Sequence, residues 1–166
     1  MNERKNQLEK IESFTIDHLR LLPGVYVSRK DKVGEKTVTT FDIRITRPNF
    51  EPVINTAELH TIEHLAATYL RNHQEYGPKT LYFGPMGCRT GFYVIFSGDL
   101  KSEDIIDLLK EMADYILAYE GDIPGYSPRD CGNYLDNNLN LAKIYIKKYK
   151  EEVLDNPTAE RLNYPN

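Results

Sequence analysis

Three residues of the segment "HTIEHL", His60, Glu63 and His64, have the types and spacing of a metal site. Residues four apart on a helix lie on one face, so His60 and His64 can direct both imidazoles at one ion. Glu63 lies just round the helix from His64, where its carboxylate can meet a metal-bound water. The pattern H-x-x-E-H is the inverse of the commoner zincin motif. The alternative is that the two histidines bind no metal and lie on the protein surface or pack partly buried against other side chains.

Cys131 is the predicted third ligand of this site. Catalytic tetrahedral sites use three protein ligands and keep one position open for water or substrate. Cys131 offers a thiolate on a turn, in a chain with only one other cysteine. Two imidazoles and one thiolate suit zinc and would also hold ferrous iron or cobalt, so the pattern predicts a divalent metal without choosing among them.

The other cysteine, Cys88, lies in the turn "PMGCRTG" between Gly87 and Arg89. A nearby cation or metal would lower the pKa of its thiol and make it a usable base or nucleophile. The alternative is a half-buried turn cysteine without a chemical role.

Composition restricts the class of protein. The chain has 166 residues and a formal net charge of -4, which suits one soluble domain and argues against nucleic acid as the main ligand. It lacks a run of roughly 20 apolar residues, and "MNERKNQLEKIE" lacks the apolar core of a signal peptide. We therefore expect a cytoplasmic protein with no membrane partner, in which the two cysteines do not form a lasting disulfide.

The elements that must position these residues alternate between strand-like and helix-like patterns. The segments "GVYVSRK" and "TVTTFDIRIT" read as strands, and "TLYFGPMGCRTGFYVIFSG" reads as two more around the Cys88 turn. In the second strand, Phe41, Ile43 and Ile45 alternate with polar residues, which places Arg44 on the opposite face.

Three helices are predicted. The first would be capped by Asn55 with Glu58 in the reciprocal position, and the second by Ser102. The third would run from about Asn133 into the 150s, with Leu135 in its apolar stripe. These elements predict a single α+β domain whose antiparallel sheet is covered on one face by helices. We expect an N-terminal extension at 1–12, the domain at 13–155 and a loose C-terminal tail at 156–166.

Five motifs, in this order and spacing, resemble the S-ribosylhomocysteine lyase family, the quorum-sensing autoinducer-2 synthases. They are "SFTIDH", "FDIR", "HTIEHL", "PMGCRTGFY" and "CGNY", and the match runs from about Ser13 to about Val153. The resemblance implies an enzyme that cleaves the thioether of S-ribosylhomocysteine. The products are homocysteine and 4,5-dihydroxy-2,3-pentanedione, the precursor of autoinducer-2, formed by successive carbonyl migration and β-elimination.

The resemblance also implies roles for particular residues. The metal ligands of the family fall on His60, His64 and Cys131, and its two proton carriers fall on Cys88 and Glu63. Positions that line its substrate pocket correspond to Ser13, His18 and Arg44. The family is a homodimer with active sites at the interface, and its physiological metal is ferrous iron, often replaced by zinc or cobalt on purification. One departure is Tyr82, where the family tends to carry an acidic residue.

Two other functions are compatible with parts of this pattern. An inverse-motif metallopeptidase would use Glu63 to activate water, but it would take a carboxylate as third ligand and have no use for Cys88. A metal-stabilised binding module would need a closed site with four protein ligands, and neither His73 nor His18 makes a convincing fourth.

Overall fold

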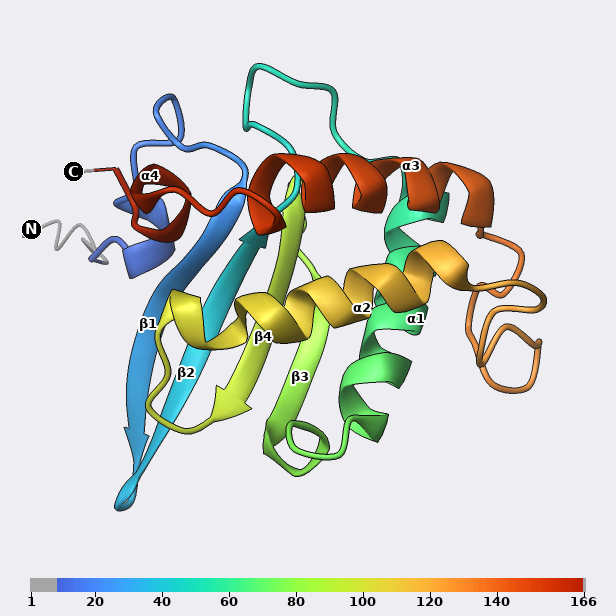
Figure 1. The fold of residues 1–166 in the computed structure, drawn as a ribbon, viewed down its shortest axis with the longest axis horizontal. Coiled ribbons are helices and arrows are strands. Elements are labelled where there is room, and N and C mark those ends of the chain that lie inside the picture. The colour runs from blue at the N-terminus through green and yellow to red at the C-terminus, as the bar shows by residue number, and fades with distance from the viewer. Residues whose placement is uncertain (1–8, 166) are drawn as a thin grey trace, which may run out of the picture.

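One four-stranded antiparallel sheet forms the centre of the molecule, with its strands in the order β1-β2-β4-β3 (Figure 1). The computed structural model describes residues 9–165; residues 1–8 of the expected N-terminal extension, and residue 166, lie outside the described residues. The strands are β1 (Gly24–Val33), β2 (Lys36–Arg44), β3 (Thr80–Pro85) and β4 (Gly91–Ser97). They form two hairpins, and β2 pairs with β4 where the hairpins meet.

Three longer helices lie on one face of this sheet (Figure 1). They are α1 (Thr56–Asn72), α2 (Ile106–Ala118) and α3 (Leu139–Tyr149), and a four-residue helix, α4 (Ala159–Leu162), lies beside β1. Short helical turns occur at Glu12–Phe14, Gly77–Lys79, Ser102–Ile105 and Lys150–Leu154. The predicted α+β fold, with helices on one face of an antiparallel sheet, is confirmed.

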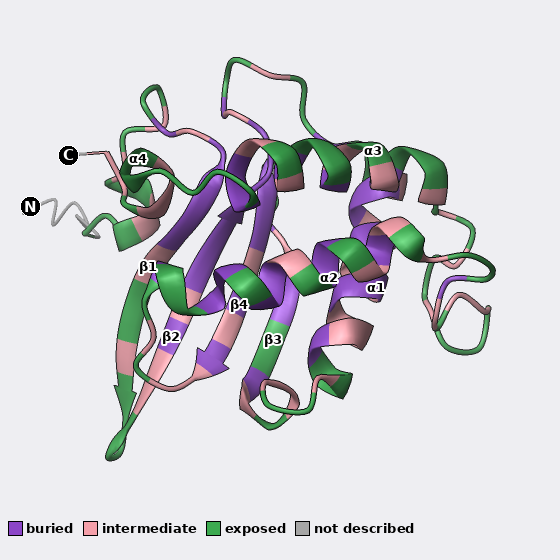
Figure 2. Ribbon diagram, in the orientation of Figure 1, coloured by how far each residue is buried: buried purple, intermediate pink, exposed green. Residues whose placement is uncertain are grey.

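The core lies between the sheet and the three helices, and Figure 2 shows buried positions along the strands and on the helices that cover them. Phe41 and Ile43 of β2 pair with Val94 and Phe92 of β4, so these four apolar side chains share the helix-facing side. All four are at most 1% exposed. The alternation of apolar and polar residues along β2 therefore predicts correctly which face of the sheet packs against the helices.

The opposite face of the sheet is also partly buried, which the sequence does not indicate. Asp42 and Arg44 point to this face and are only 0% and 2% exposed. The described part of the segment expected to be a loose tail, residues 156–165, is held in place instead: helix α4 lies beside β1, and Tyr164 stacks on Tyr26 at this face. A segment with the composition of a loop is thus fixed by contacts far away in sequence.

The predicted start of α1 differs from the observed one in its capping. Asn55 precedes α1 but makes no capping bond through its side chain. The predicted reciprocal partner, Glu58, is 2% exposed because its side chain turns into the protein, so that capping prediction was wrong.

The other two helix starts also differ from the predictions. Ser102 does not cap α2, since its hydroxyl donates to the carbonyl of Leu162. Helix α3 begins at Leu139 rather than near Asn133, because the side chain of Asn138 accepts from the Leu141 N–H and caps it there. Leu135 lies before this cap and is 74% exposed. Within residues 9–165, every helix is too short or too polar to span a bilayer.

Candidate metal and thiol site

Helix α1 presents His60 and His64 one turn apart on its half-buried side, while its apolar stripe packs into the core. The two imidazole centroids are 4.6 Å apart and the rings are nearly perpendicular, at 87°. The predicted spacing therefore does bring both rings to one place.

Backbone carbonyl groups hold both rings in one orientation. Nδ1 of His60 lies 2.9 Å from the carbonyl oxygen of Asp136, and Nδ1 of His64 lies 2.7 Å from that of Pro124. A carbonyl oxygen only accepts, so each Nδ1 carries the proton and each Nε2 presents a lone pair. This arrangement is the usual support of metal-ligating histidines.

Cys131 completes the group. Its Sγ lies 3.5 Å from Nε2 of His60 and 3.9 Å from Nε2 of His64. Bond lengths of about 2.3 Å to sulfur and 2.0–2.1 Å to nitrogen, at tetrahedral angles, would separate such atoms by about 3.6 Å. The three donor atoms lie within 4.8 Å of one another, so His60, His64 and Cys131 fit one metal ion.

The loop that carries Cys131 is tied to α1 by specific contacts. The N–H of Asn138 donates to the hydroxyl of Thr61 at 2.9 Å, and the N–H of Asn133 donates to the Cys131 sulfur at 3.4 Å. An N–H group aimed at sulfur suits a thiolate ligand. These contacts explain how a residue far away in sequence reaches the histidines.

Tyr126 supports the site and was not found from the sequence. Its ring centroid lies 4.8 Å from that of His60 and 4.4 Å from that of His64. The preceding Gly125 has a φ of +75°, and a Cβ there would approach Nδ1 of His64 to 3.3 Å. The pair "GY" in a loop rich in turn residues was the only sequence signal, and such pairs are common in loops.

Glu63 lies on α1 between the two histidines and is half-buried. Among the described residues, its carboxylate makes no hydrogen bond or ion pair. Burial raises the pKa of the nearby Tyr126 phenol, and Glu63 adds to this less than Cys131 and Asp136 do. A carboxylate in this position is available to a ligand of the site.

Cys88 lies in a separate group of polar residues at the turn between β3 and β4. Its Sγ is 3.2 Å from the hydroxyl of Thr90 and 3.8 Å from Nη1 of Arg44. Arg44 also donates to the Thr90 oxygen at 2.6 Å, so the Thr90 proton is free to point at the sulfur. The next residue, Arg89, has a φ of +59°, a left-handed conformation that tightens the turn.

These neighbours favour the thiolate of Cys88. Burial of the sulfur opposes ionisation, but the hydrogen bonds from Thr90 and the charge of Arg44 outweigh burial and lower the pKa of the thiol. The environment is therefore that of a reactive thiol rather than of an inert packed one.

Arg44 is itself fixed by a buried ion pair with Asp42. Nε and Nη2 of Arg44 donate to the two carboxylate oxygens at 3.1 and 2.6 Å, a bidentate arrangement. The sequence places both residues on one face of β2 but gives no sign that this face is buried.

The three predicted substrate residues do not lie together in one chain. His18 and Cys88 line an open cavity of ≈ 500 Å³. Ser13 lines a different cavity of ≈ 310 Å³ on the outer face of the sheet, together with Tyr82 and Tyr93. The described lining of neither cavity contains a residue of the metal group.

An α+β fold that holds a His–His–Cys group and a separate activated thiol is typical of a metal-using enzyme. The family model described as S-Ribosylhomocysteinase (LuxS) matches residues 11–160, and the chain therefore belongs to this family.

Curated relatives agree with this assignment. An S-ribosylhomocysteine lyase of Clostridium beijerinckii is 63% identical over 96% of this chain and 100% of the relative. Proteins of the same name from Clostridium acetobutylicum and Phocaeicola vulgatus are 62% and 56% identical, over 95% of this chain and 99% and 98% of those relatives. The peptidase alternative has no support, since the third donor at the histidines is a thiol and Asp136 offers its carbonyl rather than its carboxylate.

Proposed function

We propose that this protein cleaves the thioether of S-ribosylhomocysteine in a metal-dependent reaction. The products are homocysteine and 4,5-dihydroxy-2,3-pentanedione. The convergence of His60, His64 and Cys131 on one point is the observation that carries the proposal. The family membership and the relatives' names support the substrate.

The donor set suits zinc and would also hold ferrous iron or cobalt. We propose ferrous iron as the physiological metal because the family resemblance implies it. When bound, such an ion supplies a Lewis acid that stabilises negative charge developing on a substrate oxygen. Three protein donors leave one position open, as a catalytic site requires.

The chemistry explains why two proton carriers accompany the metal group. A thioether is not cut by hydrolysis here; the ribose opens and its carbonyl migrates by enolisation until the sulfur is β to a ketone. The C–S bond then breaks, the sulfur leaves with the electron pair and takes up a proton, and the two products together contain all atoms of the substrate. No external oxidant or reductant is needed.

Cys88 and Glu63 are the proposed carriers of these protons. The Cys88 thiolate, stabilised by Thr90 and Arg44, removes a proton next to the carbonyl. Glu63, without a partner among the described residues, moves protons to oxygens and to later carbons. General bases of this kind contribute roughly a hundred- to ten-thousand-fold each to the rate.

Arg44, His18 and Ser13 are the proposed substrate-binding residues. Arg44 and His18 lie next to Cys88, where they can hold the sugar or the amino-acid end of the substrate. Tyr82 replaces an acidic residue that the family tends to carry, so contacts at this position differ from the family pattern.

We propose that the active protein is a homodimer in the cytoplasm, with its sites at the interface. Ser13 and Cys88 line different cavities in one chain, which supports a site completed by a second copy. Large apolar side chains near Ser13 are exposed, Phe14 by 69% and Ile11 by 59%, and a second copy of this chain would cover them. Phe14→Glu would then give monomers in sedimentation equilibrium, whereas Ile144→Glu on α3 would leave dimers.

A thiol-release assay tests the activity. Metal-loaded, reduced protein is given S-ribosylhomocysteine, and free homocysteine is followed with a thiol reagent. The proposal expects stoichiometric thiol release that stops when the metal is removed. Thiol release that persists without metal, or no release from metal-loaded protein, would contradict it.

A further inference from the structure

The C-terminal segment, residues 156–165, is docked along the edge of the sheet at β1 by several contacts. The guanidinium of Arg161 donates to the carbonyl of Pro23 at 2.8 Å. The hydroxyl of Tyr26 donates to the carbonyl of Leu22 at 2.8 Å and also lies 3.2 Å from that of Glu160. A Cβ at Gly24 would collide with the backbone oxygen of Arg161, so only glycine allows this close approach. The segment therefore has a defined place at the start of β1.

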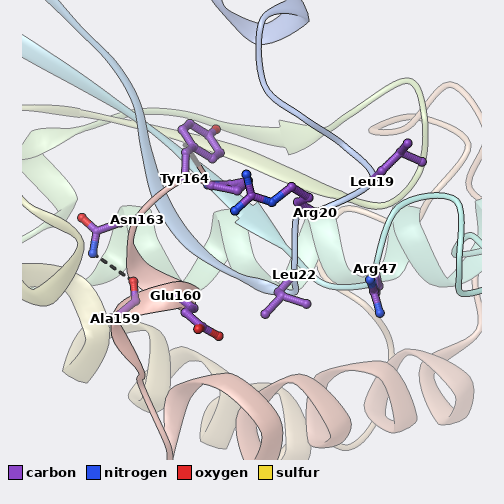
Figure 3. Close-up of a pocket in the computed structure, with 9 residues that line it drawn as sticks. Leu19, Arg20, Leu22, Arg47, Ala159, Glu160, Asn163 and Tyr164 are labelled. Carbon is purple, nitrogen blue, oxygen red and sulfur yellow. Dashed lines mark hydrogen bonds between the residues drawn. The ribbon is translucent and has the colours of Figure 1, made fainter.

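Tyr164 is the residue of this segment that contacts the buried Asp42. Its ring stacks on Tyr26, with centroids 4.7 Å apart and planes 14° from parallel. Its hydroxyl donates to Oδ2 of Asp42 at 2.9 Å. Burial, together with the charge of Asp42, raises the pKa of Tyr164, so the phenol keeps the proton that it donates. Figure 3 shows Tyr164 at the edge of the cavity beside α4, with Asn163 turned away toward Ala159.

The same carboxylate oxygen holds Arg44. Oδ2 of Asp42 accepts from Tyr164 and, at 2.6 Å, from Nη2 of Arg44. The other side of the same guanidinium, Nη1, faces the sulfur of Cys88 at 3.8 Å. A continuous series of contacts thus leads from Tyr164 through Asp42 and Arg44 to the reactive thiol. Asp42 and Arg44 are at most 2% exposed.

We propose that Tyr164 is a positioning residue: through the buried Asp42–Arg44 pair, it keeps a positive charge beside the reactive thiol. The proposal rests on the proposed function, in which the thiolate of Cys88 is a catalytic base. Tyr164 itself touches neither the sulfur nor the metal group in the contacts of the described residues.

The physical effect of Tyr164 is twofold. Its hydrogen bond fixes the plane of the Asp42 carboxylate, and with it the orientation of the bidentate partner. It also takes up part of the carboxylate charge, which leaves more of the Arg44 charge for the sulfur. Loss of the hydrogen bond reduces the positive charge near the Cys88 sulfur through both effects, because the guanidinium is drawn toward Asp42 and away from Cys88.

Besides Arg44, other titratable groups lie near the thiol, and substitution of Tyr164 removes none of them. They are His18 and Glu51, which line the same cavity as Cys88, and Tyr93 of β4. A shift produced by a change at Tyr164 must therefore pass through the Asp42–Arg44 pair.

The test measures the thiol directly, without substrate. The rate of alkylation of Cys88 by iodoacetamide is followed against pH in metal-loaded protein, and peptide mass analysis separates Cys88 from Cys131. Tyr164→Phe keeps the stacked ring and removes only the hydroxyl. Asn163→Ala is the control, because the side chain of Asn163 is exposed and, within residues 9–165, donates only to the carbonyl of Ala159.

We expect Tyr164→Phe to move the midpoint of the alkylation profile to higher pH, with a rate about threefold lower below both midpoints, which corresponds to about half a pKa unit. Asn163→Ala should match the wild type. A folded Tyr164→Phe with an unchanged midpoint would overturn the proposal. Phenylalanine is nearly isosteric with tyrosine, so we expect Tyr164→Phe to fold even if Tyr164→Ala does not. A thermal unfolding transition verifies that Tyr164→Phe is folded. Wild-type protein that releases no thiol from S-ribosylhomocysteine would instead refute the proposed function, and the alkylation result would still decide the role of Tyr164.

Discussion

The sulfur of Cys131 lies 3.5 Å from Nε2 of His60, although 71 positions separate the two residues in the chain. Together with His64, they bring three metal-donor atoms within 4.8 Å of one another, with Nε2 of each imidazole facing the sulfur. A single ion at this point would be bound by all three.

His60→Ala is expected to weaken metal retention, because two remaining donors hold an ion poorly. Metal content per chain after exhaustive dialysis measures this. His73→Ala is the matched control, since His73 lies at the end of α1 near Glu111 and outside the metal group. Equal metal content in His60→Ala and the wild type would remove His60 from the ligand set.

Cys88→Ala is expected to fold and keep its metal but to lose turnover by roughly a hundred- to ten-thousand-fold, the contribution of a well-placed base. Glu63→Gln is expected to behave similarly. Steady-state thiol release measures turnover, and metal analysis measures how much metal each variant retains. Glu111→Gln, an exposed change on α2, should leave both unaffected. A turnover close to that of the wild type in Cys88→Ala would refute its role as a base.

The pH dependence of the reaction should reflect the environment of Cys88. Its pKa is lowered in the folded protein, so the thiolate is present above that value and is lost as the pH falls through it. Arg44→Met removes the neighbouring cation, which raises the thiol pKa. The acid limb of the kcat/KM profile should therefore move to higher pH. A limb that stays in place would show that Arg44 does not act on this thiol.

Asp42→Asn tests the buried ion pair on the outer face of the sheet. Removal of one charge leaves Arg44 buried and uncompensated, which typically costs about 3–5 kcal/mol of folding free energy. Asp31→Asn provides the comparison, since the exposed Arg29–Asp31 pair contributes about 0–1 kcal/mol. Urea unfolding of both variants measures the difference. Similar values for the two would mean that the Asp42–Arg44 pair does not stabilise the fold.

The sequence predicts those parts of the site that depend on local periodicity. The four-residue spacing places His60 and His64 together, and alternation along β2 places Asp42 and Arg44 on the face opposite the core. Cys131 was the natural third donor because the chain offers so few thiols. In each case, side-chain type and spacing carry the information.

The remaining features depend on tertiary contacts that leave little trace in sequence. The carbonyls of Pro124 and Asp136 orient the histidines, and a backbone acceptor has no residue signature. Tyr164 lies in a stretch with loop composition, so its docking on Tyr26 was not predicted. The capping prediction at Asn55 failed because the Glu58 side chain is buried in the protein and makes no reciprocal bond at the helix start.

The central claim is that one metal ion is held by two imidazoles and the thiolate of Cys131. Cobalt-loaded protein tests it most directly, because a thiolate bound to cobalt gives a near-ultraviolet charge-transfer band. We expect this band in the wild type and in Cys88→Ala, and we expect it to be absent from Cys131→Ser loaded with the same amount of cobalt. A band that survives in Cys131→Ser, or one that disappears in Cys88→Ala, would contradict the assignment.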